Sequence, residues 1–236
     1  MKNGIEGVAF DLDGTLYPDR RLHRKIVHLV LKEWRLVAAF SKTRKIIRKE
    51  QENTQNFPDD FYQYQADVTA KILFGENYEP LHQPLKEIIE NRIYKAWETP
   101  FKAIRLFKGV KETLIALREA GYKLGLLSDF PPEKKLKYLG LSDIWDAVLC
   151  SEQCGALKPH PLSFQKLAQA MTLPPEKVLY VGNSHPYDVT GANRAGMKTA
   201  WIKPKFAPAG RKKPAADFAF SDYRQLHNFL ITSNDV

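Results

Sequence analysis

Two aspartates near the N-terminus stand where a short apolar run stops. In the stretch IEGVAFDLDGTLYP, residues 5–18, they are Asp11 and Asp13. Carboxylates two residues apart lie on the same side of an extended chain and repel each other. They are tolerated together when a divalent cation is shared or when one carboxyl stays protonated. Gly14 permits a turn and Thr15 can hydrogen-bond a carboxylate or an oxyanion, although Asp-x-Asp-Gly also makes ordinary turns.

Other polar side chains stand at or near the ends of further apolar runs. Ser128 ends the run in YKLGLLSDF, Asp188 follows the run in VLYVGNSHPYD, and Lys158 lies between them in GALKPHP. In an open parallel sheet, ligands bind beyond the carboxyl ends of the strands. We therefore expect these residues to lie close to Asp11 and Asp13.

The elements that position them alternate between strand and helix. The apolar runs are short and are bounded mostly by Gly, Asp, Asn or Pro, and helical periods such as GVKETLIALREAG lie between them. This alternation predicts an α/β fold with a Rossmann-like parallel sheet core and helices on both faces. The predicted strands are residues 5–10, 122–127, 147–150, 178–181, 199–202 and, more weakly, 217–220.

One interval breaks this alternation. Between Tyr17 and about Phe107 no segment has a convincing strand pattern. We predict a core made of residues 1–17 and 103–236, with an α-helical insert over 18–102 directly after the first strand. The helical patterns in the insert lie near residues 20–40, 42–53, 57–74 and 81–98.

Taken together, these segments resemble the haloacid dehalogenase-like (HAD) hydrolase superfamily, in the branch whose helical cap is inserted after the first motif. The resemblance rests on FDLDGTLY, LFKGVKETLIALREAGYKLGLLSDF, GALKPHPLSF and VLYVGNSHPYDVTGANRAGMKTAWI, in that order. It covers nearly the whole core. Within residues 18–102 it extends only to their helical character.

The resemblance implies a role for each residue at the strand ends. Asp11 attacks phosphorus and forms an aspartyl-phosphate, and Asp13 protonates the leaving oxygen and then activates water. Lys158 offsets the clustered negative charge, and Ser128 with the neighbouring amide holds phosphoryl oxygens. The implied cofactor is Mg²⁺. The substrate-binding residues would be Thr15, Ser128, Asp129 and Lys158, and the metal ligands Asp11, Asp13, Asp188 and Asn183.

The expected activity is that of a Mg²⁺-dependent phosphatase acting on a small phosphate monoester. Dehalogenating relatives lack an acid at the position of Asp13, so its presence favours phosphoryl transfer over cleavage of a carbon–halogen bond. The alternative is a HAD-like binding or scaffold protein with weakened catalysis, which uses its basic cap to bind an anionic partner.

Two residues depart from the usual motifs. The fourth motif usually reads Gly-Asp-Ser but here has Asn183, and the second usually reads Ser-Asn but here has Asp129. One hypothesis is a compensating exchange, in which Asp129 restores the charge that Asn183 lacks. The other is that Asn183 ligates the metal through its amide oxygen and Asp129 is incidental.

The positive charge is concentrated in one segment. The chain carries a formal net charge of +9, and residues 20–49 hold eleven Lys/Arg against the single acid Glu33. These cations can form a solvated helical face, or part of the segment can overhang the site and attract an anionic substrate. Nucleic-acid or acidic-membrane binding is a minority interpretation, because no strong nucleic-acid signature is present.

The remaining features concern the cysteines, the cellular location and the partners of the protein. Two cysteines, Cys150 and Cys154, are expected to be reduced intracellular thiols rather than a redox pair. We find no membrane span or signal peptide in the sequence and expect a cytoplasmic protein. Its expected partner is a small phosphorylated substrate, and the sequence assigns no oligomeric state. In the aromatic stretch 57–67, Phe57, Phe61 or Tyr64 packs in the cap or lines the pocket.

Overall fold

A six-stranded parallel sheet forms the core of the computed structural model, which describes residues 4–52, 54–75, 84–203 and 216–231. The strand order is β3-β2-β1-β4-β5-β6, so that β1 is paired with β2 on one side and with β4 on the other. The predicted α/β fold and its six strands are confirmed. The strands are β1 (Gly7–Phe10), β2 (Lys123–Ser128), β3 (Ala147–Cys150), β4 (Val178–Gly182), β5 (Lys198–Ile202) and β6 (Phe218–Phe220).

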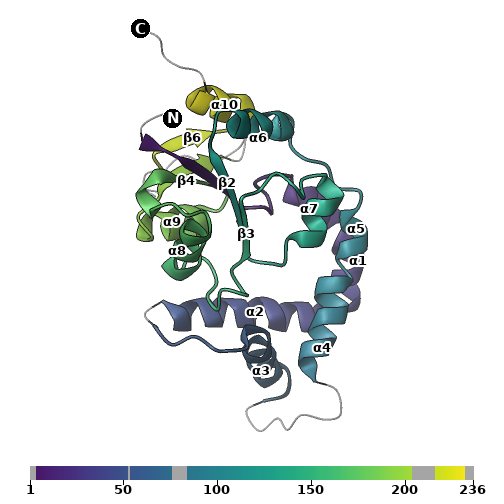
Figure 1. Ribbon diagram of the computed structural model, residues 1–236. Coiled ribbons are helices and arrows are strands. Elements are labelled where there is room, and N and C mark those ends of the chain that lie inside the picture. The colour runs from purple at the N-terminus through teal and green to yellow at the C-terminus, as the bar shows by residue number, and fades with distance from the viewer. Residues whose placement is uncertain (1–3, 53, 76–83, 204–215, 232–236) are drawn as a thin grey trace, which may run out of the picture.

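Helices cover both faces of this sheet because its strands are apolar on both sides. Val8 and Phe10 of β1 pack in one buried cluster, together with residues of α6 and α10. Ala9, between them, points to the opposite face and packs with residues of α8 and α9. Successive strand residues alternate in this way, so both faces need a helical cover. These helices are α6 (Val110–Glu119), α8 (Pro161–Ala170), α9 (Thr190–Arg194) and α10 (Tyr223–Ile231). Figure 1 shows α6 and α10 on one side of the sheet and α8 and α9 on the other.

Further helices are inserted between β1 and β2 and form a helical cap. Figure 1 shows them grouped apart from the layers of the sheet. They are α1 (Asp19–Lys32), α2 (Trp34–Gln51), α3 (Phe61–Phe74), α4 (Leu85–Ile89), the π-helical turn η2 (Glu90–Lys95) and α5 (Glu98–Phe101). The short elements that complete the core are α7 (Glu133–Leu139), η3 (Pro175–Lys177) and η4 (His185–Val189).

The first two cap helices divide at a different place from the one predicted. The predicted break lies near residue 41, whereas the backbone leaves the helical region at Glu33, with φ −109° and ψ 29°. The packing explains this position. Leu22 and Ile26 before the break belong to the core cluster, and Leu36 and Phe40 after it pack in a separate cluster of the cap. Residue 53 and residues 81–83 of the predicted helices lie outside the described residues.

The third cap helix begins later than predicted because a side chain caps it. The carboxylate of Asp60 accepts a hydrogen bond from the Gln63 amide at 2.9 Å, so α3 begins at Phe61. The predicted helix began four residues earlier, where Pro58 precedes this cap.

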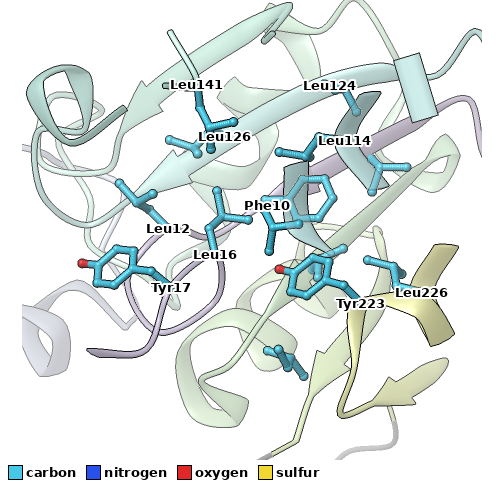
Figure 2. Close-up of a cluster of buried hydrophobic side chains, with 14 of the residues drawn as sticks. Phe10, Leu12, Leu16, Tyr17, Leu114, Leu124, Leu126, Leu141, Tyr223 and Leu226 are labelled. Carbon is cyan, nitrogen blue, oxygen red and sulfur yellow. The ribbon is translucent and has the colours of Figure 1, made fainter. Parts of the chain in front are cut away.

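The loop after β1 is fixed by its own apolar residues. Leu12, Leu16 and Tyr17 are fully buried and belong to the core cluster drawn in Figure 2. The hydroxyl of Tyr223 donates to the Thr15 carbonyl at 2.8 Å and ties this loop to α10. Because these anchors alternate with the polar residues of the loop, Asp11 and Asp13 keep a defined direction.

Two further observations concern the cysteines and the possibility of a membrane-spanning helix. Both cysteines, Cys150 and Cys154, are free and buried. Among the described helices, none combines the length and the apolar character that crossing a membrane requires.

Replacing Leu114 by Ala tests the packing of α6 against the sheet. Leu114 is fully buried, so the substitution should lower the free energy of unfolding by about 2–5 kcal/mol. The matched control is Ile115→Ala on the same helix, where the side chain is 41% exposed and the loss should stay below about 1 kcal/mol. Urea unfolding followed by circular dichroism measures both, and equal losses would contradict this placement of the helix.

Candidate active site

A buried lysine joins two carboxylates at the carboxyl end of the sheet. The ammonium of Lys158 donates to Asp11 Oδ1 and to Asp188 Oδ1, each at 2.7 Å. Asp11 follows β1, Asp188 lies in η4 after β4, and Lys158 precedes α8. All three are buried. The structure thus brings together three of the predicted site residues, which the sequence placed on separate segments.

The charges of this group depend on one another. Burial raises the pKa of Asp11 to about 7, and the nearby carboxylates of Asp188 and Asp13 add to the rise, while Lys158 opposes it. Burial alone would lower the pKa of Lys158, but Asp11 and Asp188 outweigh it and raise that pKa well above its ordinary value. The lysine therefore stays charged. It compensates for only one of the two carboxylates.

Thr15 and Asn183 lie on the other side of Asp11. The Thr15 hydroxyl is 2.7 Å from Asp11 Oδ2 and 3.2 Å from the amide oxygen of Asn183. The single hydroxyl proton serves the shorter contact best. Gly14 has a φ of +85°, and a Cβ there would lie 2.2 Å from the Asn183 amide nitrogen. The loop after β1 and the end of β4 therefore pack so closely that only glycine fits.

Asp13 points to a different set of partners. Its carboxylate pairs with Lys135 Nζ at 2.6 and 2.8 Å and accepts a hydrogen bond from the Tyr17 hydroxyl. Ser128 Oγ is 3.5 Å away. Burial alone would raise the pKa of Asp13, but Lys135 outweighs it and holds that pKa below its ordinary value.

Sequence analysis did not identify Lys135. It lies on α7 in PPEKKLKYLG, where three of five consecutive residues are lysines, and nothing in that pattern distinguishes one of them. Its contact with Asp13 joins residues that are 122 positions apart. Only the folded arrangement of α7 over the end of the sheet selects it.

Asp129 lies to one side of this group, against the cap. Its carboxylate is 2.7 Å from Arg48, accepts from the Ser151 hydroxyl at 2.5 Å and accepts from the Lys158 amide at 3.2 Å. Arg44 is 3.5 Å away. Burial alone would raise the pKa of Asp129, but Lys158, Arg44 and Arg48 outweigh it and lower that pKa. Its compensation for Asn183 stays a prediction.

Two arginines of α2 connect the cap to the core. Arg48 donates to the Lys158 carbonyl at 2.8 Å and lies over the ring of Tyr187, 4.4 Å from its centroid. Arg44 forms a buried ion pair with Glu152, which also accepts from the Tyr94 hydroxyl at 2.7 Å. The two arginines are one helical turn apart, and both project from the side of α2 that faces the core. In the sequence they were counted only among the eleven basic residues of segment 20–49. Each of them directly follows a buried residue of α2, Thr43 or Ile47, and this spacing distinguishes them from the exposed basic residues.

The other nine basic residues of the segment 20–49 are exposed. A cavity of about 640 Å³ lies between cap and core and reaches Asp13 and Lys135, but none of the eleven basic residues lines it. The interpretation that this segment overhangs the site therefore applies only to Arg44 and Arg48, through Asp129.

The aromatic stretch 57–67 contributes to the cavity at Tyr62 and Gln65. The three aromatic residues named from the sequence pack elsewhere. Phe61 and Tyr64 join the cluster of Ile47, and the Phe57 ring lies 5.0 Å from that of His160. They occupy the side of the cap that meets the loop before α8, which the spacing in the sequence did not reveal.

The oxygen donors of the site suit a hard divalent cation. The described residues contain no cluster of three or more His, Cys, Asp or Glu side chains that could hold a metal. The carboxylates of Asp11 and Asp188 nevertheless converge on one cationic group, and the amide oxygen of Asn183 lies beside the same loop. One or two carboxylates, further oxygens and water are the environment in which proteins hold Mg²⁺. These residues therefore fit that ion.

Comparison with known proteins identifies the family. The chain matches haloacid dehalogenase-like hydrolase over residues 5–196, and it belongs to that family. A glyceraldehyde 3-phosphate phosphatase from Pyrococcus furiosus is 28% identical over 239 residues, which cover 98% of this chain and 95% of that protein. The pyrophosphatase PpaX from Bacillus cereus is 28% identical over 209 residues, which cover 84% of this chain and 83% of that protein.

Solved structures share the fold. The HAD-hydrolase YfnB from Bacillus subtilis, bound to magnesium, superposes with a TM-score of 0.67 at 16% identity and covers 96% of this chain and 98% of its own. L-2-haloacid dehalogenases are also among the structures with this fold. At such low identity these likenesses show the architecture alone.

Breaking the contact between Arg48 and Asp129 tests how the cap is held to the site. Because both side chains are mostly buried, Arg48→Met and Asp129→Asn should be coupled in the free energy of unfolding by on the order of 1–2 kcal/mol. Urea unfolding of both single variants and the double variant measures this coupling. The control pairs Asp129→Asn with Lys49→Met, an exposed neighbour on α2, and should be additive. Additivity in both pairs would show that the arginine contact does not matter.

Proposed function

We propose that this protein is a Mg²⁺-dependent phosphatase that hydrolyses a small phosphate monoester through an aspartyl-phosphate. The observation that carries the proposal is the position of Asp11. One oxygen of its carboxylate is fixed by Lys158 and the other by Thr15. Two residues later in the sequence, Asp13 faces a cavity. The names of the matched relatives, phosphatases and a pyrophosphatase, support a phosphoryl-transfer reaction.

In the first half-reaction, an Asp11 oxygen forms a bond to phosphorus as the bond from phosphorus to the leaving oxygen breaks. Lys135 keeps Asp13 ionised in the free protein, and the negative charge of the incoming phosphate raises its pKa, so that Asp13 takes up a proton when the substrate binds. It gives this proton to the leaving oxygen, which departs as the alcohol. In the second half-reaction, Asp13 takes a proton from a water molecule whose oxygen attacks phosphorus. The bond between phosphorus and Asp11 breaks and releases inorganic phosphate.

The other residues hold charge and position. The Ser128 hydroxyl and the Asp129 amide bind phosphoryl oxygens, and the Lys158 ammonium balances the carboxylates and the incoming phosphate. Thr15 fixes Asp11 Oδ2, the oxygen that Lys158 does not contact. Mg²⁺, when bound, would supply positive charge to the phosphoryl oxygens, held by Asp11, Asp188, the Asp13 carbonyl and the Asn183 amide oxygen.

Asp11→Asn tests the nucleophile. Hydrolysis of p-nitrophenyl phosphate by the wild type should require Mg²⁺, and the variant should fall to the level of the uncatalysed reaction because an amide is not a nucleophile here. Phosphate release with and without Mg²⁺ measures both. Asp143→Asn, at an exposed aspartate before β3, is the matched control and should keep full activity.

Two outcomes would contradict this proposal. Activity in Asp11→Asn equal to that of the wild type would exclude the aspartyl-phosphate. A wild type with no activity at saturating Mg²⁺ would favour the alternative, a binding protein with weakened catalysis, to which the neutral Asn183 in the metal loop points.

Asn183→Asp and Asp129→Asn test the exchanged motif residues. Restoring the acid at position 183 should strengthen Mg²⁺ binding, because a charged oxygen replaces a neutral one. If Asp129 compensates for Asn183, removing its charge should weaken Mg²⁺ binding in the wild type and have little effect in the Asn183→Asp background. Isothermal titration of Mg²⁺ into both single variants and the double variant measures this. Additive effects would reject the compensation and support the amide oxygen as an independent ligand.

A further inference from the structure

The cavity beside Asp13 has the place and size to hold the part of the substrate that leaves. Its volume is about 640 Å³, within the usual range for pockets that bind small molecules. Asp13, which in the proposed reaction protonates the leaving oxygen, lines it together with Lys135. The alcohol portion of the ester would therefore lie against the remaining walls.

Those walls are mostly apolar and aromatic. On α1, three residues that recur every fourth position face the cavity: Leu22, Ile26 and Val30. Side chains from the other elements continue the surface, namely Ile89, Trp97, Phe101, Phe130 and Tyr138. Polar side chains such as His23 and Gln65 also line the cavity. Against the apolar part of the wall, however, the hydroxyls of a leaving group would face carbon atoms, whereas an apolar leaving group would remove hydrocarbon surface from water on both sides.

The charges around the cavity do not favour a second anionic group. Four lysines line it, and each is paired with an acid: Lys86 with Asp60, Lys95 with Glu90, Lys134 with Glu98 and Lys135 with Asp13. Within the described part of the chain, the acids that line it are Asp13, Asp19, Glu90, Glu98 and Glu133, so they outnumber the lysines by one. A second phosphate or a carboxylate would have to displace an existing ion pair.

We propose that the substrate is a phosphate monoester of a largely apolar, ring-sized organic alcohol. This inference rests on the proposed phosphatase reaction and names the substrate class for it. The reaction is unchanged: the bond from phosphorus to the alcohol oxygen breaks, Asp13 supplies the proton, and the apolar alcohol leaves through the cavity.

A pair of esters with the same ring tests the inference. Cyclohexyl phosphate and myo-inositol 1-phosphate differ in the hydroxyls on the six-membered ring, and the inositol ester has the better leaving group. We expect kcat/KM to be at least about tenfold higher for cyclohexyl phosphate, because the apolar wall formed by α1 favours a ring without hydroxyls. Pyrophosphate should be a poorer substrate than cyclohexyl phosphate. A preference for either polar substrate would overturn the inference.

Two neighbouring residues of α1 provide the matched variants. Val30 lines the cavity, and Leu31 is 69% exposed and is not part of the cavity wall. Val30→Asp should reduce the ratio of kcat/KM for cyclohexyl phosphate over myo-inositol 1-phosphate by about tenfold or more, and Leu31→Asp should leave it within about twofold. This ratio does not depend on how much of a variant is folded. Val30→Thr, which keeps the shape of the side chain, should lower the ratio less but in the same direction.

The outcomes separate this inference from the proposed function. If p-nitrophenyl phosphate is hydrolysed but Val30→Asp and Leu31→Asp give the same ratio, the substrate class is wrong and the phosphatase proposal stands. If no ester is hydrolysed, the phosphatase proposal fails, and binding of the neutral dye N-phenyl-1-naphthylamine tests the cavity alone. Loss of its fluorescence in Val30→Asp but not in Leu31→Asp would support an apolar binding cavity, and equal fluorescence in both would overturn it.

Discussion

The buried ammonium of Lys158, shared by Asp11 and Asp188, is the interaction on which the other parts of the site depend. Two carboxylates buried close together repel each other, and both could not stay ionised without a cation between them. The lysine and its partners come from three separate segments, the nearest two of which are 30 positions apart. The parallel order of the sheet brings these segments together, because β1 and β4 are neighbours and both end at the same edge.

The surrounding structure serves to keep this ammonium and its partners in place. Leu12 and Leu16 anchor the loop of Asp11 in the hydrophobic core, so the polar residues between them cannot turn inward. On the other side, Asp129 and Arg48 hold the backbone amide and carbonyl of Lys158. Arg48 belongs to the cap, so the position of the lysine depends on contacts from both parts of the molecule.

Most of the fold was predictable, and part of the site was. The strands were recognisable because buried parallel strands are short apolar runs. The grouping of Asp11, Lys158 and Asp188 was predictable because the carboxyl ends of the strands in such sheets converge. The break between α1 and α2 at Glu33 was not predictable, because it depends on which hydrophobic cluster each of the two helices packs against. Lys135 was not predictable either, because it is one of 36 Lys and Arg residues and only its contact with Asp13, 122 positions away, distinguishes it. Arg48 was counted only within the basic segment, although its spacing beside buried Ile47 was a usable signal.

The central place of β1 in the sheet has a consequence for how the protein is made. Its two neighbours, β2 and β4, are translated long after it, and Asp11 precedes Asp188 by 177 positions. At about 5–20 residues per second, the ribosome needs roughly 9 to 35 seconds for that interval. During this time β1 has no pairing partner on one or both sides, while the cap helices, which follow one another in the sequence, can already pack. A nascent chain that stops before β4 carries both aspartates of the first loop and still has no site.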